Sequence, residues 1–377
     1  MKVIKTISAF GLVAILLLIG FGCDKNDDGS DDGSGSDFNR KALLENTAGN
    51  IVIPNYQDLV NQLSTLKEKT DAFTNSPGKK KLDEAQQAFK DAYVTWQHCS
   101  TFDFGPANNT LRANVNTFPV DIATINNNIT TGNYDFAGLY ANDEKGFPAL
   151  DYLLFGKEDD QAVIDSFTNT PDAQNRKTYL NDVVKDLQDN VESVHNDWQA
   201  SGGNYIEEFV NNTGTGEGSS LSFLVNELSK DWEIIKDNEL GIPVGEKSID
   251  DEKFPEKVQA LYSEYSVKLA LEHAKAIENI FLGRARSGAD GKGFDEYLRS
   301  LDAQKSGKPL AKQIREQFGT CKQKIQAIPS PLSESVNDNE SKVKDAFDDV
   351  LRNLAFIKTD MASALGVQIT YQDNDGD

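Results

Sequence analysis

The chain has 377 residues, enough for one large domain or two ordinary ones with a sizeable buried core. Apolar side chains make up 38% of it, and 60 acidic against 38 basic residues give a formal net charge of −22. This composition excludes an acidic disordered polymer, and we expect no nucleic-acid partner, because phosphate backbones are bound by clustered cations. Three cysteines and three histidines are too few for a zinc finger, an iron–sulfur cluster or a disulfide scaffold.

Residues 1–22 have the pattern of an export signal, with two lysines before an apolar run that is short for a membrane span. The run ends in Ile19-Gly20-Phe21-Gly22-Cys23, which resembles a bacterial lipobox, although Gly20 stands where leucine is preferred. We therefore expect a lipid on Cys23. The alternative is soluble export with Cys23 as a free thiol.

Residues 23–37 follow as an acidic tether. After Cys23 the segment holds six Asp, one Lys and no apolar side chain, so it cannot bury anything and is expected to be a flexible spacer. One interpretation is a solvated tether that holds the folded part off a membrane. The other, by resemblance to Bacteroidetes lipoproteins, is a signal for the outer face of the outer membrane.

From Tyr56 onward, apolar residues recur at helical spacing, and no segment of more than a few residues alternates as a strand would. This pattern predicts amphipathic helices that pack stripe to stripe in bundles. The stripes are Leu59, Leu63, Leu66 and Phe73; Leu82, Ala85, Phe89, Tyr93 and Trp96; Val184, Leu187, Val191, Val194 and Trp198; Leu221, Leu224, Val225, Leu228 and Trp232; Val258, Leu261, Tyr265 and Leu269; and Val343, Phe347, Val350, Leu354 and Ile357.

Glycine and proline clusters predict the breaks between these helices. They lie at residues 201–203, 214–218, 241–243, 287–291 and 329–331. The first two clusters flank residues 201–218, which we take as the boundary between an N-terminal bundle, 38–200, and a C-terminal bundle, 201–377. No sequence repeat crosses that boundary.

Several blocks recur in a fixed order between about Phe38 and the C-terminus, at residues 92–96, 102–107, 118–121, 146–156, 230–233, 241–243, 276–279 and 365–367. Together they resemble the imelysin family of bacterial envelope proteins, in its Bacteroidetes lipoprotein branch. The resemblance implies two helical-bundle halves around a shared cleft, a link to iron acquisition in some members, and a peptidase label.

The hallmark of that family is Gly-x-His-x-x-Glu at a helix start, where a histidine and a carboxylate one turn apart could share a metal ion. The matching positions here are Gly146, Pro148 and Asp151. Pro148 offers no lone pair to iron or zinc, but it suits a first helical turn, so the block predicts a helix entrance. The altered motif supports neither metal binding at this site nor peptidase activity.

Asp151 falls on the apolar stripe of that helix, at the i+4 position from Phe147. A buried carboxylate needs a partner. Either Asp151 bonds a backbone amide or a basic side chain, or it lines a cleft and holds a ligand or cation. The blocks above supply the other cleft candidates, which are Gly146, Pro148, Trp96, Asp103, Asp121 and Glu278.

No other pattern supports a hydrolase. His98, His195 and His273 lack the paired spacing of zinc peptidases, and no nucleophile elbow occurs. A Ser-His-Asp triad stays open, because its members meet only in space. Cys99 and Cys321 either form a disulfide in an oxidising compartment or remain thiols.

We therefore expect an all-α protein whose two helical-bundle halves pack into one elongated body. Its predicted role is that of an exported, membrane-anchored lipoprotein of the outer membrane or cell surface. It would bind iron or an iron-bearing ligand without catalysis, and an outer-membrane transporter is a possible partner. Another possibility is a purely structural partner of such a transporter with no affinity for a small ligand. The alternative is a metal-dependent peptidase of the imelysin type whose metal ligands come from elsewhere. No catalytic residue, ligand identity or oligomeric state is assigned.

Overall fold

The computed structural model describes residues 38–138 and 141–371, which lie within one compact unit. The predicted export signal, Cys23 and the acidic tether lie outside these residues. Regular structure in the described part is helical, apart from one small antiparallel hairpin of β1 (Gln304–Lys305) and β2 (Lys308–Pro309). The all-α prediction is confirmed. None of the described helices has both the length and the apolar character needed to span a bilayer.

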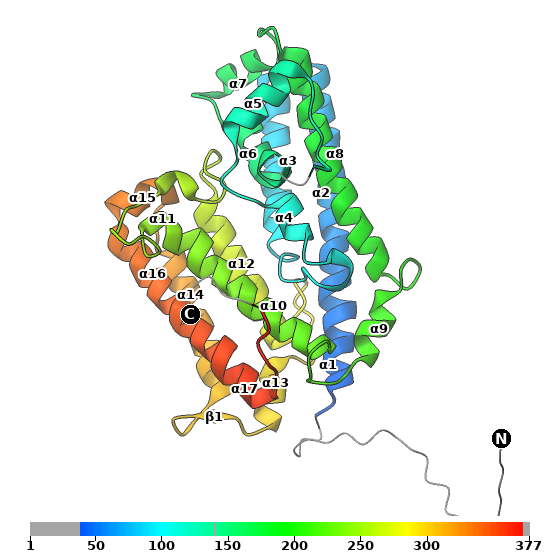
Figure 1. The fold of residues 1–377 in the computed structure, drawn as a ribbon, viewed down its shortest axis with the longest axis vertical. Helices are drawn as coiled ribbons and strands as arrows, with labels where there is room; N and C mark the ends of the chain where they lie inside the picture. Colours follow the sequence, from blue (N-terminus) through cyan, green and yellow to red (C-terminus); the bar gives the residue numbers. More distant parts are fainter. Residues whose placement is uncertain (1–37, 139–140, 372–377) are drawn as a thin grey trace, which may run out of the picture. The chain divides into compact units, whose positions relative to one another are not determined.

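The helices fall into two groups along the chain, with short π and 3-10 segments between them (Figure 1). The first group is α1 (Arg40–Asn46), α2 (Ile53–Asn75), α3 (Lys79–Trp96), α4 (Leu111–Val115), α5 (Ile122–Thr131), α6 (Gly146–Phe155), α7 (Asp160–Ser166), α8 (Ala173–Trp198) and α9 (Tyr205–Asn211). The second group is α10 (Ser220–Ile234), α11 (Ile242–Val244), α12 (Ser266–Leu282), α13 (Phe294–Ser300), α14 (Leu310–Gln326), α15 (Leu332–Asp338), α16 (Glu340–Leu354) and α17 (Ala362–Leu365). The π segments are η1 (Thr47–Val52), η4 (Ile235–Gly241) and η6 (Ala355–Met361), and the 3-10 segments are η2 (Gly105–Ala107), η3 (Ala141–Glu144) and η5 (Pro255–Lys257).

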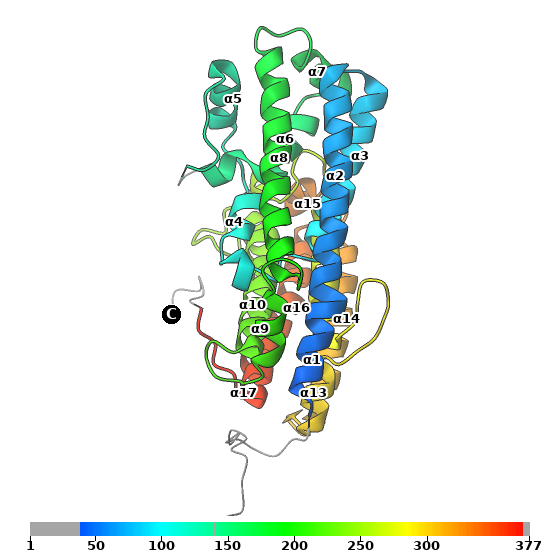
Figure 2. The same ribbon diagram turned by 90° about the vertical axis from the view of Figure 1, so that its right-hand side faces the viewer.

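In the first group, the long helices α2, α3 and α8 pack together, with α2 and α8 side by side in both views (Figures 1 and 2). The predicted stripes face this contact: Leu59, Leu63 and Leu187 are fully buried. Full burial of one such side chain is worth roughly 1.5–3 kcal/mol. Helix α6 packs against both α3 and α8, so its start is held by the framework rather than by a loop.

In the second group, α14 packs against both α12 and α16. Trp232 on α10 sets its ring edge-on to Phe318 on α14, at 5.0 Å between centroids, and its Nε1 donates to the Val350 carbonyl at 2.8 Å. Helix α12 also packs against α3, so the two groups share an interface. The boundary at 201–218 contains α9, which packs back on α1 and α8. The division into two domains stays a prediction.

The predicted break at residues 241–243 is wrong. The π segment η4 ends at Gly241, and α11 continues directly from Ile242. Pro243 is the second residue of α11 and is accommodated within this continuous helical path. The helical path ends only at Gly245, whose φ of +90° is left-handed.

The stripe of residues 258–269 was predicted as one helix, and this is also wrong. Helix α12 begins only at Ser266. The residues before it form irregular turns in which Ala260 and Glu264 have φ of 51° and 57°. Left-handed φ values at two non-glycine residues are incompatible with a right-handed helix. This turn becomes one wall of the candidate site.

Candidate functional site

A cleft of about 350 Å³ opens beside the start of α6. Three segments line it: residues 118–120 with Ile122, the first turns of α6, and residues 256–258 and 260–262 before α12. Its walls are largely apolar, and its titratable lining groups are Asp151, Glu256, Lys257 and Tyr262. A mostly apolar hollow with a few placed polar groups is the usual form of a small-molecule site.

The start of α6 is fixed by Gly146, as the sequence predicts for a helix entrance. Gly146 has a φ of +72°, and a Cβ built there would lie 2.4 Å from the Val115 carbonyl oxygen. Only glycine fits this position. Pro148 follows in the first turn, where its lack of an amide proton is harmless, and it lines the cleft.

Asp151 lies one turn further on and is buried, with 2% of its surface exposed. Its Oδ2 accepts from the Tyr262 amide at 2.8 Å and its Oδ1 from the Ser263 amide at 3.0 Å. The turn with left-handed Ala260 and Glu264 presents these two amides as an anion-binding nest. Burial raises the pKa of Asp151 to about 6, against the lowering effect of hydrogen bonds from Ser263 and Tyr262. The carboxylate therefore has backbone partners and also lines the cleft.

The residues at the hallmark positions do not fit a metal ion. Pro148 carries no donor atom, and both Asp151 oxygens accept backbone amides. Within residues 38–138 and 141–371, no group of three or more His, Cys, Asp or Glu side chains is arranged to hold a metal. We derive no chemical step through a metal at this site.

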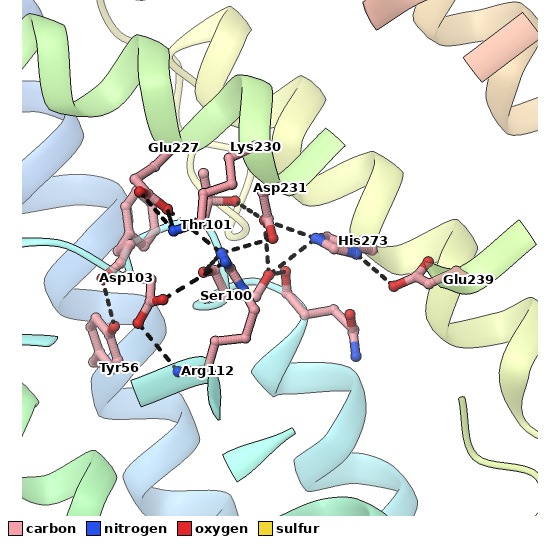
Figure 3. A network of polar contacts seen from close by, with 12 residues as sticks. Tyr56, Ser100, Thr101, Asp103, Arg112, Glu227, Lys230, Asp231, Glu239 and His273 are labelled. Atoms are coloured by element: carbon pink, nitrogen blue, oxygen red, sulfur yellow. Dashed lines mark hydrogen bonds and ion pairs between the residues drawn. The ribbon is translucent and has the colours of Figure 1, made fainter. Parts of the chain in front are cut away.

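A second polar assembly lies nearby (Figure 3), and we call Asp103, Arg112, Glu227, Asp231, Glu239 and His273 the buried charge cluster. All of these are buried except Arg112, whose side chain is 13% exposed. Arg112 on α4 is the centre of the cluster. Arg112 Nη2 lies 3.0 Å from Asp231 Oδ1 and 3.8 Å from Glu227 Oε2, and Arg112 Nη1 lies 3.7 Å from Asp103 Oδ2. The same guanidinium donates to the Ser100 carbonyl at 2.7 Å. The cluster thus ties the 97–104 segment and α4 to α10.

His273 on α12 completes the cluster. Its Nε2 lies 2.8 Å from Asp231 Oδ2, and its Nδ1 lies 2.8 Å from Glu239 Oε1. Burial alone would lower the pKa of His273, but the two carboxylates outweigh it and raise the pKa to about 10. Both ring nitrogens therefore donate, and the side chain is an imidazolium at neutral pH.

Ser100, His273 and Glu239 follow one another as a hydrolase triad would, with Ser100 Oγ 3.1 Å from His273 Nε2. Ser100 Oγ also lies 3.0 Å from Asp231 Oδ2, to which it donates. A general base must be able to take the proton of its nucleophile. Because His273 already holds protons on both nitrogens, these residues do not form a working triad.

The π segment η4 brings Glu239 to this position. In an ideal α-helix, the side chain eight positions after Asp231 would point about 80° away from that of Asp231, measured around the helix axis. The wider π turn advances each residue by a smaller angle, so Glu239 returns to the face that carries Asp231. Both carboxylates consequently reach the same imidazole ring.

The cluster lies next to the cleft. A neighbouring hollow of about 320 Å³ is lined by Asp103, Arg112 and Lys230 from the cluster's edge and by Phe118, which also lines the cleft. Lys230 pairs with Glu227 at 3.2 Å. With Lys230 included, three cations face four carboxylates, so the charges of the cluster are nearly balanced. The cations are Arg112, Lys230 and His273, and the carboxylates are Asp103, Glu227, Asp231 and Glu239.

The other sequence candidates are dispersed. Asp103 belongs to the buried charge cluster. Trp96 is fully buried in the core with its ring 6.4 Å from that of Phe147. Asp121 is exposed and caps α5 by accepting from the Thr124 amide at 3.0 Å.

Glu278 is half-buried on α12, pairs with Lys322 of α14 and is not among the residues that line the cleft. The structure therefore brings Gly146, Pro148 and Asp151 together at one site. It places Asp103 beside that site and gives Glu278 a contact between two helices.

Sequence reasoning missed most of the cluster. Asp231 lies on an apolar stripe beside Leu228 and Trp232, and His273 lies between buried Ala270 and Ile277. A charged residue on an apolar helix face is the signal that singled out Asp151, and the same rule would have found both residues. Nothing local indicated that they contact each other.

Cys99 and Cys321 are both free and both buried, so the disulfide alternative is not realised in this structure. Burial raises the pKa of the Cys99 thiol, and it raises that of Cys321 to about 12. Neither thiol is poised as a nucleophile.

Comparison with known proteins identifies a family, a relative and similar solved structures. The family model described as Imelysin matches residues 52–355. Iron-regulated protein A of Synechococcus elongatus is 21% identical over 308 residues, which are 78% of this chain and 77% of that protein. Among solved structures, a protein of Parabacteroides distasonis described as an iron-regulated protein A precursor has a TM-score of 0.68 at 18% identity, covering 88% of this chain and 97% of its own. An imelysin-like protein of Psychrobacter arcticum has a TM-score of 0.69 at 15% identity, covering 90% and 100%.

Proposed function

This chain belongs to the imelysin family, and we propose that it is a non-catalytic binding component of the cell envelope that takes up iron or an iron-bearing ligand. The observation that carries the proposal is the cleft at the hallmark positions. There a proline replaces the family's histidine, and the carboxylate is shortened to Asp151 and held by two backbone amides. Such a site retains a shaped hollow for a ligand, and among the described residues its lining includes no Ser, Thr, Cys or His side chain.

The link to iron rests on relatives. One similar protein and one similar structure are named iron-regulated protein A. The formal charge of −22 adds a surface that attracts cations. Iron would be cargo, brought as an ion or inside a complex, rather than a resident cofactor.

Export and anchoring are part of the proposal. The apolar leader, Cys23 and the acidic tether favour a lipoprotein of the outer membrane or cell surface, held beside a transporter. A Cys23→Ser variant should lose metabolic labelling by palmitate and leave the membrane fraction. Labelling that persists without Cys23 would contradict a lipid at that residue. Co-purification with a transporter from solubilised membranes tests the partner.

The binding role is tested by equilibrium dialysis of the purified chain against ferric citrate, a ferric trihydroxamate and haemin. Saturable binding of at least one supports the proposal, and binding of none contradicts it. Leu261→Arg places a charge in the cleft wall and should abolish that binding. Leu351→Arg, at an exposed apolar position on α16, is the matched control and should bind normally.

A second assay distinguishes a peptidase from the proposed binding protein. Unfolded casein is incubated with the chain and zinc or ferrous iron, with and without a chelator. Intact casein is expected. Chelator-sensitive cleavage that is absent from a mock purification would favour the peptidase.

A further inference from the structure

We infer that the cleft selects a ligand whose bound part is an apolar chain or ring ending in a protonated amine, which pairs with Asp151. The inference rests on the proposed binding role, because it names the chemistry that the cleft accepts. An organic ammonium would then occupy the place that the family's hallmark gives to a metal ion.

The first argument is the shape of the hollow. Its volume of about 350 Å³ lies at the lower end of small-molecule sites. Phe118, Pro119, Val120 and Leu261 contribute apolar walls, and Ile122, which is 37% exposed, extends them to the rim. The walls therefore suit a hydrocarbon body and offer little to a strongly hydrated ion.

The second argument is the unbalanced charge of Asp151. Its two amide bonds come from neutral backbone groups. The charge of Lys90 lowers the pKa of Asp151, but among the described residues no lysine, arginine or histidine lies within ion-pair distance of this carboxylate. A buried carboxylate without a counter-cation is costly, so a cation that arrives with the ligand gains more there than at the surface.

Two lysines near the site, Lys257 in the lining and Lys90, whose charge acts on Asp151, place their ammonium groups over aromatic rings. Lys257 at the rim places its ammonium over the Phe254 ring at 3.9 Å. Lys90 on α3 lies between Phe155 and Tyr265, at 5.1 and 5.3 Å from their ring centres. Exposed Glu256 adds a second acidic group to the lining. The cleft thus disfavours a carboxylate ligand and favours an ammonium.

The test uses three probes of one shape and different charge: hexylammonium, 1-hexanol and hexanoate. Ligand-observed NMR titrations of the full chain at pH 7.5 should show saturable hexylammonium binding, about tenfold weaker hexanol binding and no hexanoate binding. Equal binding of all three, or no hexylammonium binding, would overturn the inference. Hexylammonium binding displaced by zinc or ferrous ion at equimolar concentration would also overturn it, because the site would then prefer a metal.

Asp151→Asn should reduce hexylammonium affinity to the level of hexanol. Asp121→Asn is the matched control: the same change on an exposed helix cap outside the cleft lining should leave the affinity unchanged. If Asp121→Asn weakens binding as much as Asp151→Asn, the effect is general electrostatics and the inference fails.

A pH series on the unaltered chain keeps the inference testable if Asp151→Asn does not fold. The charged or titratable groups that face Asp151 are Lys90 and Tyr93 of α3, Tyr262, and Glu256 and Lys257 of the rim. Burial raises the pKa of both Tyr93 and Tyr262, so neither titrates near pH 6. Hexylammonium affinity should fall about tenfold between pH 7.5 and 5, while hexanol affinity stays constant. A flat hexylammonium profile contradicts the inference.

The outcomes for ligand class and for proposed function are separate. Failure of the hexyl series with normal ferric-complex binding removes the ammonium inference alone. If hexylammonium binds but no iron species does, the proposed iron-binding function is wrong, while the inference of an organic ammonium ligand still holds.

Discussion

Asp231 Oδ2 lies 2.8 Å from His273 Nε2, with both side chains buried and 42 positions apart in the sequence. The pair joins α10 to α12, the helix that also packs against α3. His273 and Arg112 hold the pKa of Asp231 well below its usual range, although burial alone would raise it. The pair is therefore an ionised contact at the centre of the fold, beside the cleft.

Replacement of His273 by Gln should destabilise the protein strongly. It leaves Asp231 and Glu239 buried with one cation fewer, and breaking a buried pair on one side costs about 3–5 kcal/mol. Urea unfolding at pH 7 measures the free energy of unfolding. Lys185→Gln, which removes an exposed pair with Asp189, is the control and should leave the free energy of unfolding nearly unchanged, because solvent screens exposed pairs. Similar losses in both variants would contradict the buried pairing.

Stability should depend on pH through His273. Its pKa is about 10 in the folded protein, above about 6.5 for an unperturbed histidine. A raised folded pKa adds stability that is complete below about pH 6.5 and is lost as pH rises through about 10. The difference in unfolding free energy between the unaltered chain and His273→Gln should accordingly shrink from pH 6 to pH 10. A constant difference would show that His273 carries no extra proton.

Gly146→Ala should disrupt the entrance to α6. A left-handed φ costs a non-glycine residue roughly 1–2 kcal/mol, and the contact at 2.4 Å with the Val115 carbonyl adds to it. We expect a loss of about 2 kcal/mol or more in urea unfolding. Gly319→Ala is the control, because that glycine lies inside α14 and an added Cβ would meet nothing within 4 Å. Its free energy of unfolding should rise by roughly 0.5–1 kcal/mol. Equal effects would contradict the strained entrance.

Cys99 and Cys321 should behave as protected thiols. Both are buried, and burial raises the pKa of each, so the reactive thiolate is scarce. Pulse alkylation followed by peptide mass spectrometry should label neither in the folded protein and both after unfolding without reductant. Labelling only after reduction would indicate a disulfide.

Local sequence patterns predicted the helices well where the stripe was continuous. Leu59, Leu63 and Leu187 face the core as their spacing indicates, because helical periodicity depends only on neighbours along the chain. The same rule failed before Ser266, where apolar residues at helical spacing lie in turns. There, the backbone conformation is set by contact with Asp151, which is more than 100 positions away.

The amino-acid sequence on its own determined the helical class, the glycine–proline entrance to α6 and the need of Asp151 for a partner. Each of these follows from short-range geometry or from the cost of burying one charge. Tertiary structure alone decided which partner each charge obtained: backbone amides for Asp151, and two carboxylates for His273. Electrostatic pairing depends on distance in space, and packing of the helices brings together groups that the chain keeps far apart.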